Sequence, residues 1–274
     1  MIRWRLFEAG HCRHPEIATR RDGALGACEF PSLAALLQHP RQGWMLFDTG
    51  YAAHFLTATQ AFPERLYRWV TPVHLQPHEP LVEQLRVAGI GPDDIRWVVL
   101  SHLHGDHVAG IADFPRARIA LSQAAWDDLR GRNRWSATRQ GFLPRLLEGA
   151  TPRMDWFEQR PACSLPAALQ AFGQGYDLLG DGRLLLVPLP GHAPGHFGLW
   201  FEDAQGPVFL IGDAAWSSDA LVDAAPPPRL VSSWLGDTPR YLETLAHLRE
   251  LRRAHPRLRI VPSHCRQWRE HTHG

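Results

Sequence analysis

The sequence predicts an α/β fold, a sandwich of two β-sheets with helices on its outside. Apolar, strand-like runs fall into two groups along the chain, and segments with helical periodicity separate and follow these groups. Three short strands in close succession open the second group, which is typical of a meander. The predicted strands span residues 2–6, 43–50, 96–100 and 117–121 in the first group, and residues 184–189, 196–201, 208–211 and 258–261 in the second.

Helices are indicated by their start and stop signals. One helix is predicted over residues 80–89, with a proline in its first turn and a glycine at its end. Ser122 is expected to cap a second helix, and Asp237 or Thr238 a third, because short polar side chains satisfy the free N–H groups of a first turn.

Between about residues 126 and 169 the pattern loosens, because glycines and prolines interrupt it repeatedly. We interpret this segment as a helix-and-loop insertion within one domain that spans residues 1–274. Trp126, Trp135 and Trp156 lie in the segment. These rings either form an apolar pocket wall or fill a thin core beneath loops.

Composition and charge exclude several classes of protein. A chain of 274 residues can bury a substantial core. Its 29 Lys and Arg residues nearly balance 28 Asp and Glu residues, which argues against a nucleic-acid partner. No apolar run approaches the roughly 20 residues of a membrane helix, and the first residues lack the features of a secretory signal. We therefore expect a cytoplasmic protein, with no membrane partner, whose four cysteines are free thiols.

The most informative segment is the run S-H-L-H-G-D-H at residues 101–107, which follows an apolar strand. Neutral imidazole is the commonest protein ligand for zinc and similar divalent ions, and carboxylate is a good companion. Packing alone does not require such a density of imidazoles. The segment therefore predicts a metal site with His102, His104, Asp106 and His107 as ligands.

Three further candidate ligands follow distant strands. His192, Asp213 and His264 each come after an apolar strand, beside a glycine or proline turn. Loops at strand ends are where a rigid scaffold can bring distant side chains together. We expect these residues to join the first loop in one site.

Five motifs occur in order along the chain: L-F-D-T-G with Asp48, S-H-L-H-G-D-H, P-G-H-A-P-G-H with His192, I-G-D with Asp213, and S-H with His264. In this order and type of spacing, from about residue 44 to residue 264, the chain resembles the metallo-β-lactamase superfamily. The resemblance implies an αββα four-layer sandwich with two divalent metal ions, expected to be zinc, between the edges of the sheets.

The resemblance also implies a role for each candidate. The first ion would be bound by His102, His104 and His192, the second by Asp106, His107 and His264, and both by Asp213. Asp48 would either hold the second nitrogen of a ligating histidine or simply form a turn.

The activity that the resemblance implies is hydrolysis of a lactone or ester, with a hydroxide that bridges the metals attacking the carbonyl carbon. Asp106 would act catalytically by passing a proton to the leaving oxygen. The layout is most similar to that of compact N-acyl homoserine lactonases. The expected partner is a small-molecule substrate with an apolar portion, and a homodimer is left open.

The chain departs from those lactonases at one position. They place a tyrosine three residues after the bridging aspartate, where its hydroxyl contacts the substrate carbonyl, and this chain has Trp216 there. An indole N–H donates a hydrogen bond but exchanges no proton. Tyr51 and Ser217 are the candidates to supply the missing hydroxyl.

Two other activities stay open within the same fold. Thioester hydrolases of the glyoxalase II type carry a helical domain after the last histidine, whereas ten residues follow His264. Mononuclear iron sulfur dioxygenases keep two histidines and one carboxylate on iron, and the larger ligand set here favours a binuclear hydrolase. A non-catalytic relative would be expected to lack ligands. We interpret the His11-Cys12-His14 segment as structural, near the site, rather than as a third metal site.

Overall fold

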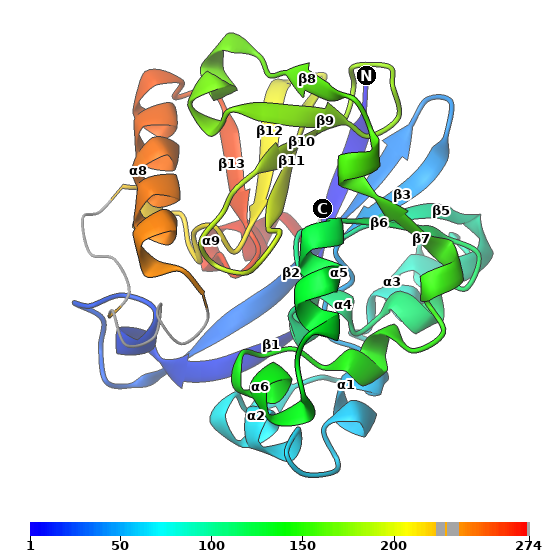
Figure 1. Ribbon diagram of the computed structural model, residues 1–274, viewed down its shortest axis with the longest axis vertical. Coiled ribbons are helices and arrows are strands. Elements are labelled where there is room, and N and C mark those ends of the chain that lie inside the picture. Colours follow the sequence, from blue (N-terminus) through cyan, green and yellow to red (C-terminus); the bar gives the residue numbers. More distant parts are fainter. Residues whose placement is uncertain (223–227, 229–235, 273–274) are drawn as a thin grey trace.

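Two β-sheets pack face to face in the computed structural model, which describes residues 1–222, 228 and 236–272 (Figure 1). The first sheet has the order β4 (Val73–His74), β1 (Arg3–Pro15), β2 (Ala27–His39), β3 (Gly43–Phe47), β5 (Ile95–Val99), β6 (Arg118–Leu121) and β7 (Met154–Trp156). The second sheet has the order β13 (Arg259–Pro262), β12 (Gly206–Gly212), β11 (Phe197–Asp203), β10 (Leu185–Pro188), β9 (Gln174–Asp177) and β8 (Ala162–Ser164). The predicted sandwich and the meander β10–β11–β12 are confirmed.

Helices cover the outer faces of both sheets (Figure 1). The first sheet is flanked by α1 (Ala53–Ala58), α2 (Arg65–Val70), α3 (Leu81–Val87), α4 (Gly105–Val108), α5 (Gln123–Arg130) and α6 (Arg134–Arg139). The second sheet is covered by α8 (Thr238–Ala254), and α9 (Arg266–Arg269) follows β13. The expected caps are present, because Ser122 accepts a hydrogen bond from the backbone of Ala125, and Asp237 one from that of Arg240.

The core has three apolar layers, because both faces of each sheet are covered. Met45 and Phe47 of β3 point between the sheets, where they belong to the same buried cluster as Phe201 of β11. Leu46 points the other way, toward the helices over the first sheet. The layer under α8 forms against the outer face of β12. Within the described residues, none of the helices is long and apolar enough to cross a membrane, and all four cysteines are free thiols, as predicted.

The sequence pattern does not predict β2, β7 or β8. Residues 33–37 of β2 are apolar without interruption and buried, so the strand lacks the alternation that reveals a half-exposed strand. The strands β7 and β8 are three residues long, which is too short to show a period. They extend the first and the second sheet respectively, so the segment of residues 126–169 contributes to both sheets as well as to helices and loops.

Parallel strand pairs bring the functional loops to one edge of each sheet. β3 and β5 run parallel with Phe47 opposite Val99, so Asp48 lies beside the start of the loop at residues 100–107. β12 and β13 run parallel with Gly212 opposite Pro262, so Asp213 lies beside the segment that carries His264.

Candidate metal centre

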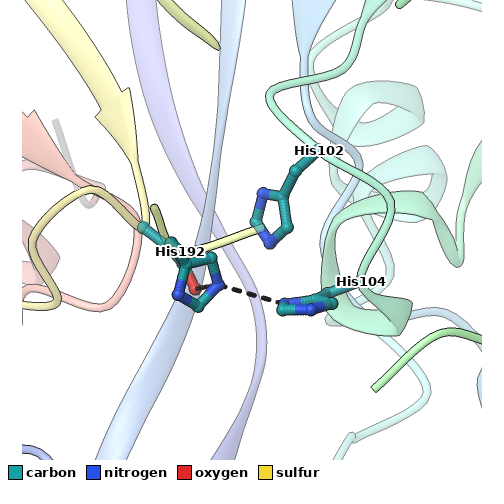
Figure 2. A group of neighbouring side chains, drawn as sticks. His102, His104 and His192 are labelled. Carbon is teal, nitrogen blue, oxygen red and sulfur yellow. Dashed lines mark hydrogen bonds and ion pairs between the residues drawn. The ribbon is translucent and has the colours of Figure 1, made fainter. Parts of the chain in front are cut away.

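The first group of donors lies between the two sheets. His102 and His104 come from the loop after β5, His192 comes from the loop after β10, and Figure 2 shows the three rings converging from the two sides. Nε2 of His192 lies 3.1 Å from Nδ1 of His104. The centroids of the His102 and His192 rings are 4.9 Å apart.

The second group lies next to the first. Asp106 and His107 belong to the short helix α4, and His264 follows β13. An oxygen of Asp106 lies 3.3 Å from Nε2 of His264 and 3.6 Å from Nε2 of His107. All three side chains are buried.

Asp213 lies between the two groups. One of its oxygens is 3.4 Å from Nε2 of His192 and 3.1 Å from Nε2 of His264, and the other is 3.3 Å from Nε2 of His107. The structure therefore brings all seven predicted ligands together, with one carboxylate in contact with both groups.

The donor atoms fit the metal ions that the sequence implies. Each group contains one donor atom from each of its residues, and these atoms all lie within 4.8 Å of one another. For this comparison Asp213 is included in the first group. The Nε2 atoms of His102, His104 and His107 and one oxygen of Asp213 are buried and make no hydrogen bond. A buried polar atom without a partner is unfavourable unless a cation or water satisfies it. Imidazole and carboxylate donors of this number suit a divalent cation in each group.

Asp48 contacts the side of the His107 ring that faces away from the other donors. Its carboxylate lies 2.8 Å from Nδ1 of His107 and accepts two hydrogen bonds from Ser101, through the backbone N–H and the hydroxyl. The same hydroxyl is 2.9 Å from Nδ1 of His102. Of the two roles left open for Asp48, the structure shows the supporting one, since the carboxylate fixes the ring of His107. Its backbone adopts a left-handed conformation, with φ at 59°.

Two further groups hold the donors of the second sheet. The carbonyl oxygen of Pro31 lies 2.7 Å from Nδ1 of His264. The ring of His196 accepts a hydrogen bond from the backbone N–H of Asp213 at 3.1 Å. The sequence motifs predict no role for His196, although the repeated P-G-H of residues 190–196 places this second histidine four residues after His192.

The two groups differ in charge. Burial lowers the pKa of His102 and His192 well below the usual range, and lowers that of His104 to about 4, so these rings are neutral at pH 7. Burial also acts on His107 and His264, but neighbouring carboxylates outweigh it and raise the pKa of both rings well above the usual range. Without a metal ion these two rings carry protons.

The sequence and fold together identify the family. The sequence profile of the metallo-beta-lactamase superfamily matches residues 29–264. This chain belongs to the metallo-beta-lactamase superfamily. The matched region contains every predicted ligand, and the resemblance found in the sequence motifs is confirmed.

Several proteins with sequences similar to this chain are named N-acyl homoserine lactonases. The N-acyl homoserine lactonase AttM of Azorhizobium caulinodans is 30% identical over 223 residues, which cover 81% of this chain and 78% of that protein. The N-acyl homoserine lactonase AttM of Rhizobium radiobacter is also 30% identical, over 79% of this chain and 76% of that protein.

Solved structures share the fold. An N-acyl homoserine lactone hydrolase with the product N-hexanoyl-L-homoserine at its catalytic metal centre matches with a TM-score of 0.72 and 20% identity, over 97% of this chain and 94% of that chain. AidC, a dizinc quorum-quenching lactonase, matches with a TM-score of 0.64 and 17% identity, over 97% and 88% of the two chains. At this level of identity the likeness shows the αββα fold alone.

The donors open into a cavity of about 260 Å³. His104, Asp106, His192, Asp213 and His264 line its polar side. The other walls are largely apolar, and they include Phe30, Tyr67, Val70 and Trp216. The cavity can therefore admit a molecule that combines a reactive polar end with an apolar portion.

The tryptophans of residues 126–169 do not line this cavity. Trp126 and Trp156 are half-buried and pack against the core under the helices, and Trp135 is 63% exposed. The sequence left open whether these rings form a pocket wall or fill a core beneath loops. For Trp126 and Trp156 the second interpretation is correct. The apolar wall comes instead from α2, β2 and the loop after β12, including Trp216.

The two candidate hydroxyls lie in different places. Tyr51 lines the cavity but is 1% exposed. Ser217 is outside the cavity, and its hydroxyl accepts a hydrogen bond from the backbone of Ala220 at 3.3 Å. A third hydroxyl, that of Tyr67, was not identified from the sequence, because no motif surrounds it.

The His11-Cys12-His14 segment belongs to β1. Its alternate side chains point to opposite faces, so Cys12 and His14 line the cavity, whereas His11 stacks on His74 with ring centroids 5.1 Å apart. Burial raises the pKa of the Cys12 thiol to about 12, so it stays protonated. Within the part of the chain that the structure describes, no third cluster of metal-ligating side chains includes these residues.

Proposed function

We propose that this chain is a hydrolase that opens lactones or esters with two divalent metal ions, which we expect to be zinc. The observation that carries the proposal is the convergence of seven donors into two adjacent groups that share Asp213. Their opening into a partly apolar cavity supports a small-molecule substrate.

The relatives favour an acyl lactone among such substrates. Two of them are named N-acyl homoserine lactonases, and a structural neighbour holds an N-hexanoyl product at its metal centre. An acyl chain suits the apolar walls beside Val70 and Trp216. The cytoplasmic location, a homodimer and the single domain of residues 1–274 stay predictions.

The residues divide the work of hydrolysis. His102, His104 and His192 would hold one ion, Asp106, His107 and His264 the other, and Asp213 both. Bound there, two divalent ions supply Lewis acidity and lower the pKa of water toward neutrality.

The remaining residues fix those donors and move the proton. Asp48 and Ser101 hold the rings of His107 and His102, and His196 holds the backbone of Asp213. Asp106 lines the cavity, where its carboxylate could accept a proton from the attacking water and pass it to the leaving oxygen.

The donor set also bears on the alternatives. A mononuclear iron dioxygenase needs two histidines and one carboxylate, whereas this centre offers five histidines and two carboxylates. Metal analysis separates the two activities, with about two zinc ions per chain expected for the hydrolase and about one iron for the dioxygenase. Thioesters belong in the substrate test, because their carbonyl carbon is attacked in the same way.

The proposal is tested by a hydrolysis panel on the metal-loaded protein. The panel contains acyl homoserine lactones of increasing chain length, aryl esters, thioesters, phosphotriesters and a β-lactam. We expect the highest kcat/KM on acyl lactones. His104→Ala should reduce the bound metal and lower kcat/KM by about a hundredfold or more, because it removes a direct ligand.

The matched control is His54→Ala, which removes an imidazole paired with Asp113 at the surface. It should leave metal content and turnover unchanged. Full activity of the His104→Ala protein, or a preference for thioesters over all lactones, would contradict the proposal.

A further inference from the structure

Tyr67 places a phenol at the wall of the cavity, on the side of Asp106. It lies on α2, is half-buried and lines the cavity. Its ring packs edge-on against Phe55, with centroids 5.3 Å apart. Gly105 of α4 also lies beside the ring. A Cβ atom at this position would lie 3.2 Å from Cε1 of Tyr67 and still closer to Leu143 and Phe55, so the absence of a side chain leaves room for these groups.

The next residue of α4 is Asp106, and its carboxylate faces the phenol. A phenol is protonated at neutral pH, because its ordinary pKa is about 10. The hydroxyl of Tyr67 can therefore donate a hydrogen bond toward the cavity that the ring lines.

The other candidate donors lie elsewhere. Trp216 packs against His192, with ring centroids 5.9 Å apart, and so lies beside the first group. Tyr51 is buried, and its hydroxyl faces the thiol of Cys12. Tyr67 is thus the phenol that stands beside the residue expected to protonate the leaving oxygen.

We propose that the hydroxyl of Tyr67 donates a hydrogen bond to the oxygen that leaves the carbonyl carbon, acting beside Asp106. The assignment rests on the proposed hydrolase function. It makes Tyr67 a catalytic residue for departure of the leaving group, whereas Trp216 faces the other half of the centre.

The step balances without a further reactant. Water adds its oxygen to the carbonyl carbon and gives a proton to Asp106. The bond between the carbonyl carbon and the leaving oxygen breaks, and Asp106 passes this proton to that oxygen. Tyr67 keeps its own proton throughout.

The hydrogen bond gains strength as the reaction proceeds. Before bond cleavage the hydroxyl faces the Asp106 carboxylate, which becomes a weaker acceptor once it takes up a proton. The leaving oxygen at that moment gains negative charge, and hydrogen bonds to charged oxygens are about twice as strong as neutral ones. A donor that strengthens its bond only at this stage raises kcat rather than lowering KM.

The experiment compares two substrates with the same acyl chain. One is an acyl homoserine lactone, whose alkoxide leaving group needs a proton, and the other is a p-nitrophenyl ester, whose leaving group departs as an anion. For Tyr67→Phe we expect kcat on the lactone to fall by about tenfold to a hundredfold, as loss of a hydrogen bond to a charged group does. KM, kcat on the ester and the metal content should stay within about twofold of the wild type.

The control variant is Tyr176→Phe, which removes a phenol hydroxyl on β9, outside the cavity, and should leave both activities unchanged. Tyr51→Phe tests the alternative hydroxyl in the cavity wall, beside Cys12, and should show no loss confined to the lactone. If Tyr67→Phe does not fold, as judged by circular dichroism, Tyr67→Leu takes its place, because it also lacks the hydroxyl and retains apolar contact with Phe55.

The outcomes separate this assignment from the proposed function. Equal losses on both substrates, a change in KM alone, no change, or a lactone-specific loss in Tyr51→Phe would each overturn the role of Tyr67 while lactone hydrolysis by the wild type stands. A wild type that is loaded with metal and hydrolyses no lactone overturns the proposed function, and the role of Tyr67 with it.

Discussion

The two donor groups are equally buried, yet they hold their histidines in opposite protonation states. In the first group burial dominates and lowers the pKa of every ring. In the second group the carboxylates of Asp106 and Asp213 dominate and raise the pKa of His107 and His264. The number of carboxylates in contact with a buried imidazole, rather than its depth, therefore decides its charge.

This difference sets how each group can take up a metal ion. A ring nitrogen binds metal only when it carries no proton. The rings of the first group can bind a metal ion at neutral pH without losing a proton. In the second group, His107 and His264 must first release the protons that the neighbouring carboxylates stabilise. Asp213 belongs to both groups, so it links two sites with unlike requirements.

The largest effect is expected from Asp213→Ala, which removes the carboxylate that the groups share. Both groups lose a donor, and His107 and His264 lose a carboxylate in contact with their Nε2 atoms. We expect bound metal to fall from about two ions per chain to less than one, and kcat/KM to fall by about a thousandfold or more. Metal analysis and lactone hydrolysis measure the two effects.

The matched control is Asp128→Ala, which removes a carboxylate of α5 paired with Arg132 at the surface. It should leave both readouts unchanged. Retention of both ions by Asp213→Ala would show that the two groups bind metal independently.

Metal affinity should depend on pH differently in the two groups. His107 and His264 have a raised pKa and are protonated at pH 7 in the metal-free protein, so each must lose a proton before its nitrogen can bind. Affinity for the second ion should therefore fall as the pH falls, by about tenfold per pH unit for each proton released.

The first group provides the internal comparison for this titration. His104, with a pKa of about 4, is unprotonated from pH 6 to pH 8, and so are His102 and His192. Its affinity should be nearly constant over this range. Proton release measured in weak buffer should accompany the second ion but not the first, and equal release with both ions would contradict the difference in charge.

A smaller and more selective effect is expected from Asp48→Asn. Asp48 contacts Nδ1 of His107 at 2.8 Å, and the amide lacks the charge that supports this ring. We expect about tenfold to a hundredfold weaker binding of the second ion, the usual cost of losing a partner behind a ligating histidine, with the first ion unaffected. Competition with a chelator measures both affinities.

Asp113→Asn is the matched control, because it makes the same change beside a histidine outside the centre, His54. Equal weakening of both ions by Asp48→Asn would mean that its contacts with Ser101 support the first group as much as the second.

The sequence predicted the strands of the fold where their pattern was informative and not elsewhere. The meander and the strands β3 and β5, which precede Asp48 and Ser101, have clear apolar runs bounded by turns. β2 was missed because it is apolar on both faces, and β7 and β8 because strands of three residues show no period. Such strands are determined by tertiary packing rather than by local pattern.

The donors of the centre were predictable because their residue types are rare in dense clusters and follow strand ends. Tyr67 and His196 were not, for different reasons. Tyr67 packs beside Gly105, a residue far along the chain that leaves space next to its ring. His196 accepts a hydrogen bond from a backbone N–H, and such a contact cannot be predicted from the types of the side chains. Contacts that depend on a distant backbone are visible only in three dimensions.

Each donor group draws its members from both sheets. His102 and His104 follow a strand of the first sheet and His192 one of the second, and the same division holds for the other group. A slip of one sheet along the other by a single residue would separate the members of both groups at once. Substitutions in the shared apolar layer between the sheets can therefore disable the chemistry without touching a single donor, so the tolerance of that layer to mutation is set by catalysis as well as by folding.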